Sequence, residues 1–343
     1  MYQYLSFNDP EFKTKLINEV KTNGLAVIND VFTDVECDNH MTGILNDFVS
    51  LGTNIDLNNV DITWTTNNLP AQTRPGLFQM LMSNLKDVWN IRANDNVKTI
   101  FETLYSHFRK DQIKDFIVSG DGINIKPGTV GPFKKEHTKD WAHLDQTIKG
   151  DIYKCIQGQA VLTNTTASFV ASPKSHLVFE DILNKLNVNS TANWLKFNDD
   201  QIKIVKELIL AKGGQYQIPI LSKKGSFIVW TSTTVHSAKL QSASESSTNE
   251  DKYKGWRGVI YVCYRPKSEF TKRELTKRQK VFDENRTTNH WSQTTFSKKP
   301  GSFHLYHDKR HNEIESMIKD PKLVYTKLGK PVLSDKQKCL LGL

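Results

Sequence analysis

The sequence contains few cysteines and no long apolar run. Its four cysteines are widely separated among 343 residues and form no Cys-x-x-Cys pair, which argues against a disulfide framework and a cysteine-ligated zinc site. The longest apolar stretches, such as GVIYVCY and GSFIVW, have the length of strands and are too short to cross a bilayer. The opening MYQYLSFNDPEFKTKL lacks the apolar core of a secretory signal. These absences predict a soluble, intracellular (cytoplasmic) protein without a membrane partner.

Several common catalytic signatures are also missing. There is no Gly-x-Gly-x-x-Gly fingerprint, no phosphate-binding Gly loop and no nucleophilic serine elbow, so neither a dinucleotide-binding fold nor a serine hydrolase is predicted. The net charge of +9 permits attraction to nucleic acid. Lysines and acidic residues alternate along the chain, however, so a solvated, lysine-rich surface is the favoured interpretation.

The middle of the chain has the composition of an all-β fold. Between residues 120 and 266, short segments rich in β-branched and aromatic residues alternate with Gly, Pro, Ser and Asn. This pattern predicts the strands and turns of a sandwich or barrel, interrupted by a helical insertion at about 177–212. Residues 1–119 are expected to form a helical layer on this core, and residues 267–343 a helical and irregular extension. The three parts are predicted to make one domain.

The first fifty residues predict a helix, a short strand and a second helix. The first helix is expected to start at Asp9 and Pro10 and to close at Gly24. LAVIND follows as a strand, and Thr33 is the expected N-cap of the second helix. Further along, residues 76–118 are also expected to be helical.

The stretch WAHLDQ contains the one His-x-Asp pair of the chain. On a strand, residues i and i+2 project from the same face, so His143 and Asp145 would lie side by side while Leu144 turns into the core. His236, at the end of the strand in GSFIVWTSTTVHSA, is the best candidate for a third ligand. Two imidazoles and a carboxylate form the facial triad that binds ferrous iron. A chance pairing is the alternative in a chain with ten histidines.

Four segments follow one another in the order typical of one enzyme family. LINEVKTNGLAVINDVFTDVE resembles its opening helix, strand and helix, and INIKPGT with WAHLDQ resembles its Lys-Pro segment and Trp-His-x-Asp-Gln. FVASPKSHLVFE resembles the turn after its third core strand, and KGSFIVWTSTTVHSA with WRGVIYVCYRPK resembles its distal-His and Arg-bearing strands. The chain thus resembles the phytanoyl-CoA dioxygenase-like (PhyH) family over about 11–50 and 120–266. This implies a mainly β fold with flanking helices around a double-stranded β-helix (jelly-roll, cupin-like) core.

The resemblance also implies an activity for the 120–266 core as the catalytic part. It implies that His143, Asp145 and His236 hold Fe(II), with 2-oxoglutarate and O2 as cosubstrates. The expected enzyme is a dioxygenase that hydroxylates an unactivated C–H bond while 2-oxoglutarate is decarboxylated to succinate. The protein would fix the coordination, exclude water and aim the substrate.

The far carboxylate of 2-oxoglutarate needs a fixed cation, and Arg suits this task because its planar fork pairs with a carboxylate and stays charged. Arg257, at the start of the strand after His236, is the first choice, and Arg265 is the alternative. The resemblance implies that Lys126 adds a second contact to 2-oxoglutarate. Ser237, directly after the distal His, is expected either to touch the cosubstrate or to cap a turn.

Two departures from the family pattern carry structural expectations. The polar stretch KLQSASESSTNEDKYKG between the distal His and the Arg-bearing strand is expected to be an inserted loop. Lys174 replaces the family's Gly in the Ser-His turn, so the backbone there is expected to avoid the left-handed conformation.

The substrate stays open at this stage. A small molecule is favoured, whereas a nucleic-acid base or a protein side chain is suggested by the positive charge, and an inactive binding module with the same fold is a further alternative. His304, His307 and His311 are a weaker second metal candidate, at helical spacing. RTTNHW, from Arg286 to Trp291, is a cluster that would fold back over the mouth of the site.

Overall fold

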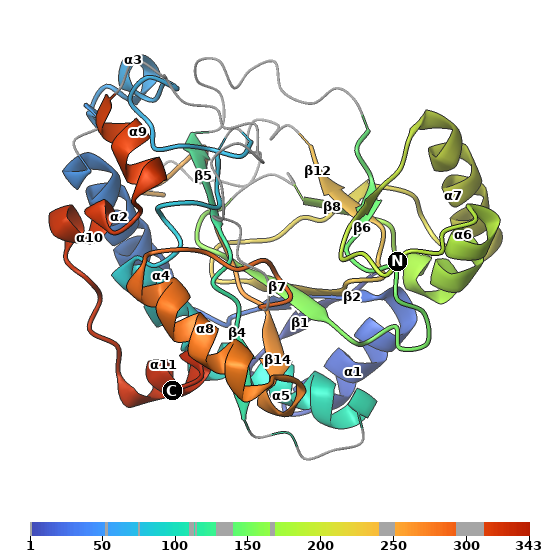
Figure 1. Ribbon diagram of the computed structural model, residues 1–343. Helices are drawn as coiled ribbons and strands as arrows, with labels where there is room; N and C mark the ends of the chain where they lie inside the picture. The colour runs from blue at the N-terminus through green and yellow to red at the C-terminus, as the bar shows by residue number, and fades with distance from the viewer. Residues whose placement is uncertain are drawn as a thin grey trace.

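The structure of the chain is a computed structural model (Figure 1). It describes residues 2–51, 54–74, 76–109, 113, 115–127, 140–164, 169–239, 251–292 and 312–343. The histidines at 304, 307 and 311, and residues 240–250 of the expected inserted loop, lie outside these described residues. Within the described part of the chain, no helix combines the length and apolar character needed to cross a membrane.

Two large sheets organise the described residues. The larger has seven strands, in the order β1 (Tyr4–Ser6), β2 (Leu25–Asn29), β11 (Phe227–Thr231), β7 (Ile156–Val161), β13 (Trp256–Tyr261), β5 (Ile123–Pro127) and β3 (Leu77–Phe78). The smaller has five strands, in the order β10 (Ile218–Pro219), β8 (Phe169–Ala171), β12 (His236–Ala238), β6 (His143–Leu144) and β9 (Leu195–Lys196). A separate pair joins β14 (Tyr264–Pro266) to β4 (Phe116–Val118).

The alternation of side chains along β2 explains how the larger sheet is covered on both faces. Leu25 and Val27 belong to an apolar cluster shared with Phe169 of the smaller sheet, whereas Ala26 and Ile28 belong to the cluster formed with the N-terminal helices. Successive side chains of a strand point to opposite faces, so one face of the larger sheet packs on the helices and the other on the smaller sheet.

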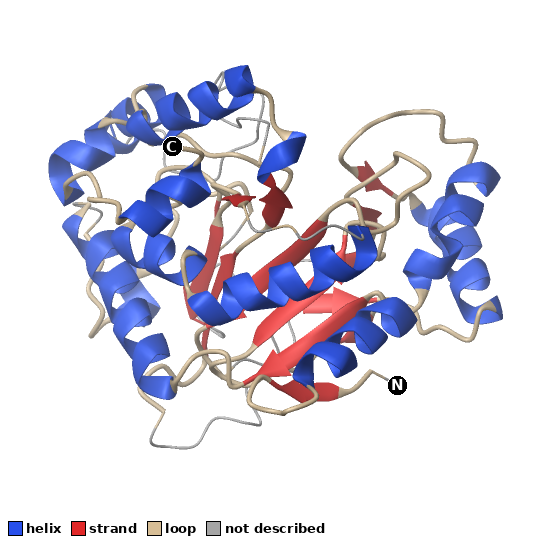
Figure 2. Ribbon diagram, turned by 90° about the horizontal axis from the view of Figure 1, so that it is seen from below, coloured by secondary structure: helices blue, strands red, loops and turns tan. Residues whose placement is uncertain are grey.

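Helices cover the outer face of the larger sheet, and Figure 2 shows them lying across its strands. They are α1 (Phe12–Asn23), α2 (Asp34–Ser50), α4 (Lys86–Arg92) and α5 (Asp95–Arg109), with the short α3 (Val60–Thr63) between α2 and β3. The predicted caps are confirmed, because Gly24 closes α1 in the left-handed conformation and Thr33 forms a capping box with Glu36.

Two further helices cover the outer face of the smaller sheet. They are α6 (Phe179–Lys185) and α7 (Asp199–Ala211), which Figure 1 shows at one side of the molecule, beside β6, β8 and β12. Their apolar residues share a cluster with Leu144, which is fully buried as predicted. The helical insertion therefore serves as the layer behind the predicted metal-binding strands.

The C-terminal part carries α8 (Lys272–Asp283), α9 (Asn312–Lys319), α10 (Leu323–Leu328) and α11 (Asp335–Leu341). Arg278 of α8 is buried and donates hydrogen bonds to three backbone carbonyls, those of Val118, Ser292 and Leu341. One side chain thus ties α8 to β4, to the chain beyond α8 and to the last helix. The extension packs on the core through defined polar contacts.

The structure differs from the sequence prediction in three places. The segment 76–118 contains β3, an irregular stretch and β4 besides its two helices, and residues 1–119 add β1, β2 and β3 to the larger sheet. Helices and strands are both extensive, so the fold is mixed α/β rather than mainly β. Lys174 adopts the left-handed conformation, with φ +69°, so the prediction that this turn avoids it was wrong. Its backbone N–H donates to the carbonyl of Asn23, which holds the turn against the end of α1.

Gly24 permits that close approach, and Gly24→Ala is expected to destabilise the protein. Gly24 has φ +74°, and an added Cβ would lie 2.4 Å from Nδ1 of His176 and 2.6 Å from Oγ1 of Thr234. The strained φ costs about 1–2 kcal/mol and the clash about as much again. Gly255→Ala is the matched control, because Gly255 has φ +78° with nothing within 4 Å of an added Cβ. Chemical denaturation should show the larger loss for Gly24→Ala, and equal losses would contradict the steric argument.

Candidate metal centre

The smaller sheet places the two predicted histidine ligands opposite each other. β12 pairs with β6 in antiparallel register, with His236 facing His143, and the two imidazole rings have centroids 4.2 Å apart. Asp145 follows β6 directly, and its backbone N–H donates to the carbonyl of Ser232. Backbone pairing therefore brings together residues that are far apart in the sequence.

The side chains of these three residues converge. Nε2 of His236 lies 3.2 Å from Oδ2 of Asp145, and Nε2 of His143 lies 3.7 Å from Oδ1. One ligand atom from each residue can be chosen so that all three lie within 4.8 Å of one another, and all three residues are buried. Among the described residues this is the one group of three or more His, Cys, Asp or Glu side chains that could hold a metal ion.

Both imidazoles are oriented by backbone carbonyls. Nδ1 of His143 lies 3.3 Å from the carbonyl oxygen of Trp141, and Nδ1 of His236 lies 2.9 Å from that of Thr234. An N–H at Nδ1 that donates to a carbonyl leaves the lone pair on Nε2, the atom turned towards Asp145. Outer hydrogen bonds of this kind orient histidines that bind metals.

The protonation states of His143 and Asp145 also favour binding of a cation. Burial, and then the neighbouring His236, lower the pKa of His143 to about 3, so its imidazole is neutral at physiological pH. Burial acts to raise the pKa of Asp145, but the electrostatic effect of His290, His143 and His236 outweighs it and holds that pKa below the usual range. The site therefore offers the neutral nitrogen of His143, the imidazole of His236 and one carboxylate, a ligand set that fits a divalent metal ion.

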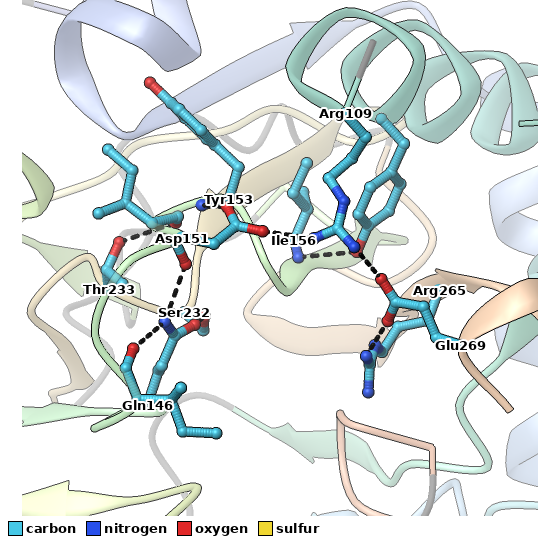
Figure 3. Close-up of polar contacts among 12 residues, drawn as sticks. Arg109, Gln146, Asp151, Tyr153, Ile156, Ser232, Thr233, Arg265 and Glu269 are labelled. Carbon is cyan, nitrogen blue, oxygen red and sulfur yellow. Dashed lines mark hydrogen bonds and ion pairs between the residues drawn. The ribbon is translucent and has the colours of Figure 1, made fainter. Parts of the chain in front are cut away.

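Hydrogen bonds behind the triad fix the loop that carries Asp145. Figure 3 shows Gln146 between two segments: Nε2 donates to the carbonyls of Ile148 and Asp151, and Oε1 accepts from the hydroxyl of Ser232 at 2.7 Å. Gln146, the last residue of WAHLDQ, thus anchors the loop after β6 to the turn after β11.

Gln157 of β7 fixes the Asp145 carboxylate itself, since its Nε2 donates to Oδ2 at 2.9 Å. Gln157→Leu is expected to lower the affinity for Fe(II) or Co(II) about 10–100-fold, because the carboxylate loses its orienting partner. Metal titration of the variant, followed by the absorption of bound Co(II), would measure this. Gln159→Leu is the matched control, on the same strand but not lining the cavity. Equal affinities of the two variants would contradict a positioning role for Gln157.

The triad lies in a cavity of about 690 Å³ between the two sheets. Residues from both sheets and from the segment after α8 line it: Thr73, Arg74, Leu77, Gln79, Asp121, Trp141, His143, Asp145, Gln157, Phe169, Asn193, Trp194, Trp230, His236, Ser237, Ala238, Arg257, Tyr261, Asn289 and His290. Three tryptophans and a phenylalanine stand among these groups, so the cavity combines an aromatic wall with convergent polar residues, as ligand sites do.

Arg257 lies in this cavity as a buried cation. It is 2% exposed, its Nε donates to Oδ1 of Asn124 at 3.1 Å, and its guanidinium also hydrogen-bonds the hydroxyl of Tyr261. Burial lowers its pKa. Among the described residues, no Asp or Glu forms an ion pair with Arg257. A buried charge without a counter-ion costs free energy, so binding of an anion in the cavity is favoured.

The other predicted cosubstrate residues lie nearby to different degrees. Ser237 lines the cavity, although its hydroxyl already donates to Oε1 of Gln217. Lys126 is buried on β5, directly opposite Arg257 in the β13–β5 register, but is not among the cavity-lining residues. The structure thus places Ser237 and Arg257 among the cavity-lining residues, whereas Lys126 is not one of them.

Arg265 is placed elsewhere. It forms an ion pair with Glu269, which also pairs with Arg109, and Arg109 continues the chain of charges to Asp151 (Figure 3). Its guanidinium also lies over the Trp291 ring, at 4.9 Å. Arg265 is not among the cavity-lining residues, so of the two candidate arginines only Arg257 faces the triad.

Several residues of the cavity could not be selected from the sequence. Asp121 precedes β5 in a Gly-rich stretch, and Trp194 stands in a polar segment before β9. The RTTNHW cluster does reach the site, because Asn289 and His290 line the cavity and Nε1 of Trp291 donates to the carbonyl of Asp145 at 3.0 Å. The unusual Arg, His and Trp content of RTTNHW was the sequence feature that indicated its place at the site.

Comparisons with known proteins show a shared fold. No family model matches the chain, so membership of the phytanoyl-CoA dioxygenase-like family stays a prediction. A curated protein of Aspergillus versicolor, "Ava biosynthesis cluster protein O", is 23% identical over 235 residues, which are 64% of this chain and 68% of that protein.

Solved structures resemble the chain more broadly. The crystal structure of hypothetical protein JW0805 from Escherichia coli has a TM-score of 0.56 at 12% identity and covers 100% of this chain and 86% of its own. The epimerase SnoN, solved with Fe3+, alpha ketoglutarate and nogalamycin RO, has a TM-score of 0.43 at 10% identity and covers 75% of this chain and 84% of its own. The likeness to JW0805 establishes the overall fold of this chain and leaves its activity to the site.

Proposed function

We propose that this protein is an Fe(II)/2-oxoglutarate-dependent dioxygenase that hydroxylates an unactivated C–H bond of a small molecule. The observation that carries the proposal is one cavity that holds both a buried His-Asp-His cluster and a buried arginine without a carboxylate partner among the described residues. The first feature suits a ferrous ion, and the second suits an anionic cosubstrate. The two facing sheets would then be the double-stranded β-helix expected for this class.

Each proposed role follows from the position of a side chain. Nε2 of His143, Nε2 of His236 and the carboxylate of Asp145 would hold iron, which supplies dioxygen activation coupled to the decarboxylation of 2-oxoglutarate to succinate. Arg257 would pair with the far carboxylate of 2-oxoglutarate, and the hydroxyl of Ser237 would contact the same molecule. The aromatic wall would exclude water and hold the substrate against the open side of the triad.

The size of the cavity favours a small-molecule substrate. Its volume of about 690 Å³ falls within the range of small-molecule sites, and its walls come from both sheets. A substrate of drug size would fit beside 2-oxoglutarate. We therefore place small molecules ahead of nucleic-acid bases and protein side chains.

The test is an anaerobic titration of the protein with Fe(II) and 2-oxoglutarate. A metal-to-ligand charge-transfer band in the visible spectrum is expected, because 2-oxoglutarate chelates the iron through its 1-carboxylate and 2-keto oxygens. Succinate should form on admission of O2. Absence of the band would refute the proposal, and a band without succinate across a broad panel of small molecules would favour an inactive binding module.

A further inference from the structure

Two polar residues of the cavity take no part in the proposed iron or 2-oxoglutarate binding. Asp121 and His290 come from distant parts of the chain and line the same cavity. Residues just before them in the chain are joined by two hydrogen bonds: the N–H of Gly120 donates to Oγ1 of Thr288 at 2.7 Å, and the N–H of Thr288 donates to the carbonyl of Gly120 at 3.0 Å. The fold therefore holds these two side chains in the same part of the wall.

The carboxyl group of Asp121 is held in place by one of its two oxygen atoms, Oδ1. Its Oδ1 accepts from the N–H of Gly122 at 2.7 Å, and its backbone carbonyl accepts from Nη2 of the fully buried Arg92 at 2.6 Å. Oδ2 makes no hydrogen bond with any described residue. Burial raises the pKa of Asp121, although the nearby His290 opposes the shift. A buried, oriented carboxyl oxygen is thus available to a ligand.

His290 contributes a second unpartnered polar atom. Its Nε2 is buried and has no hydrogen-bond partner among the described residues. The ring is held in place by its neighbours, because Trp291 is tied to Asp145 and Thr288 to Gly120. An unsatisfied buried nitrogen costs free energy that a ligand can recover.

The same cavity presents a flat apolar surface. Trp194 is 48% exposed although it lines the cavity, and its ring lies 6.3 Å from the ring of His143. An exposed tryptophan beside a candidate metal centre is a typical stacking surface for a ring.

From these contacts we infer that Asp121 and His290 bind a hydroxyl or amino group of the prime substrate, whose flat ring packs on Trp194. Both groups donate hydrogen bonds, which Oδ2 of Asp121 requires, and a hydroxyl can also accept one from His290. The inference rests on the proposed function, since it identifies the chemical class of the compound that the oxygenase would hold: a ring-containing alcohol, phenol or amine. Asp121 and His290 are then specificity-determining residues.

The test compares probes of one shape in the metal-free protein by isothermal titration calorimetry. The probes are 2-naphthol, 2-(aminomethyl)naphthalene and 2-methoxynaphthalene, of which the last lacks a donor. At least one donor probe should bind about 10-fold more tightly than 2-methoxynaphthalene, as a hydrogen bond to a charged group predicts. Equal affinities of all three probes, or no binding at about 1 mM, would overturn the inference.

Variants of Asp121 and His290 then test whether these residues cause the tighter binding of the donor probes. Asp121→Asn and His290→Gln are each expected to reduce it to about 2-fold or less. Asp47→Asn is the control, because Asp47 is a partly buried carboxyl, whose pKa is raised by burial to about 6, and it lies outside this cavity. A donor preference that survives in both Asp121→Asn and His290→Gln, with both variants folded by circular dichroism, would overturn the assignment.

The ring contact has its own variant pair. Trp194→Ala should weaken all three probes about 2–10-fold, as expected for loss of one aromatic contact, whereas Leu210→Ala should change none. Leu210 is similarly exposed, on α7, and is not among the cavity-lining residues. Unchanged binding in Trp194→Ala would overturn the stacking role.

Failure of this inference and failure of the proposed function are distinguishable. Probe binding is measured without iron, whereas the charge-transfer band is measured without probe. A native protein that shows the band but no donor preference would keep the oxygenase and lose the substrate class. A donor preference without the charge-transfer band would support the binding of such compounds and refute the proposed oxygenase function.

Discussion

Alanine at His143, Asp145 or His236 is expected to abolish the charge-transfer band of the Fe(II) and 2-oxoglutarate complex. Each side chain supplies one of three ligands, so its loss should lower iron affinity by more than about 100-fold, beyond the effect of losing an outer hydrogen bond. Anaerobic titration of each variant measures the band directly. His107→Ala is the control, because His107 is an exposed histidine on α5.

A thermal melt separates loss of metal from loss of fold. The two histidines are positioned by the β12–β6 register, which these substitutions leave in place, so the metal-free variants should stay folded. Added Co(II) should then raise the melting temperature of the native protein and of His107→Ala, but not that of the triad variants. A band that persists in all three triad variants would place the metal elsewhere.

Arg257→Met is expected to remove 2-oxoglutarate binding while sparing iron binding. The substrate carboxylate would lose its buried partner, at a cost of about 2–5 kcal/mol, and Fe(II) affinity should stay within a factor of about 3. Titration of 2-oxoglutarate into the Co(II) form measures the first quantity. Arg257→Lys keeps the charge but not the planar fork, so it should retain only part of the affinity.

The same variant carries a stability signature that a purely structural arginine would not show. Arg257 is buried with no carboxylate partner among the described residues, so methionine removes an uncompensated charge at the expense of the hydrogen bonds to Asn124 and Tyr261. The free energy of unfolding without ligand should therefore fall by no more than about 1 kcal/mol. A large loss of stability, with 2-oxoglutarate affinity intact, would contradict the proposed role.

The candidate triad could be predicted from the sequence because local rules and the resemblance to the phytanoyl-CoA dioxygenase-like family indicated the same three residues. His143 and Asp145 are two residues apart around a short strand, and Leu144 between them is apolar, which is enough to assign one face to the cavity and the other to the core. His236 was found because it follows an apolar strand, although the structure ends that strand, β11, at Thr231 and places His236 at the start of β12. These signals need no knowledge of which strands pair.

The polar wall opposite could not be predicted, because its residues meet only through tertiary contacts. The hydrogen bonds between Gly120 and Thr288 bring Asp121 and His290 to the same wall, and no spacing in the sequence predicts that pairing. The two-residue strand β3 likewise gave no periodic signal. Lys174 shows the limit of residue-type rules, since its hydrogen bond to Asn23 outweighs the cost of a left-handed backbone.

The pairing of β2 with β11 also decides when this protein can fold. Leu25 lies opposite Trp230 in the antiparallel register, so the strand made among the first is completed by one made some two hundred residues later. At about 5–20 residues per second, a ribosome needs about 10–40 s to supply that partner. During this interval the apolar LAVIN segment has only the short β1 to pair with, and contacts of such long range also slow folding. Slower growth at lower temperature and chaperone supply should therefore increase the soluble yield from recombinant expression.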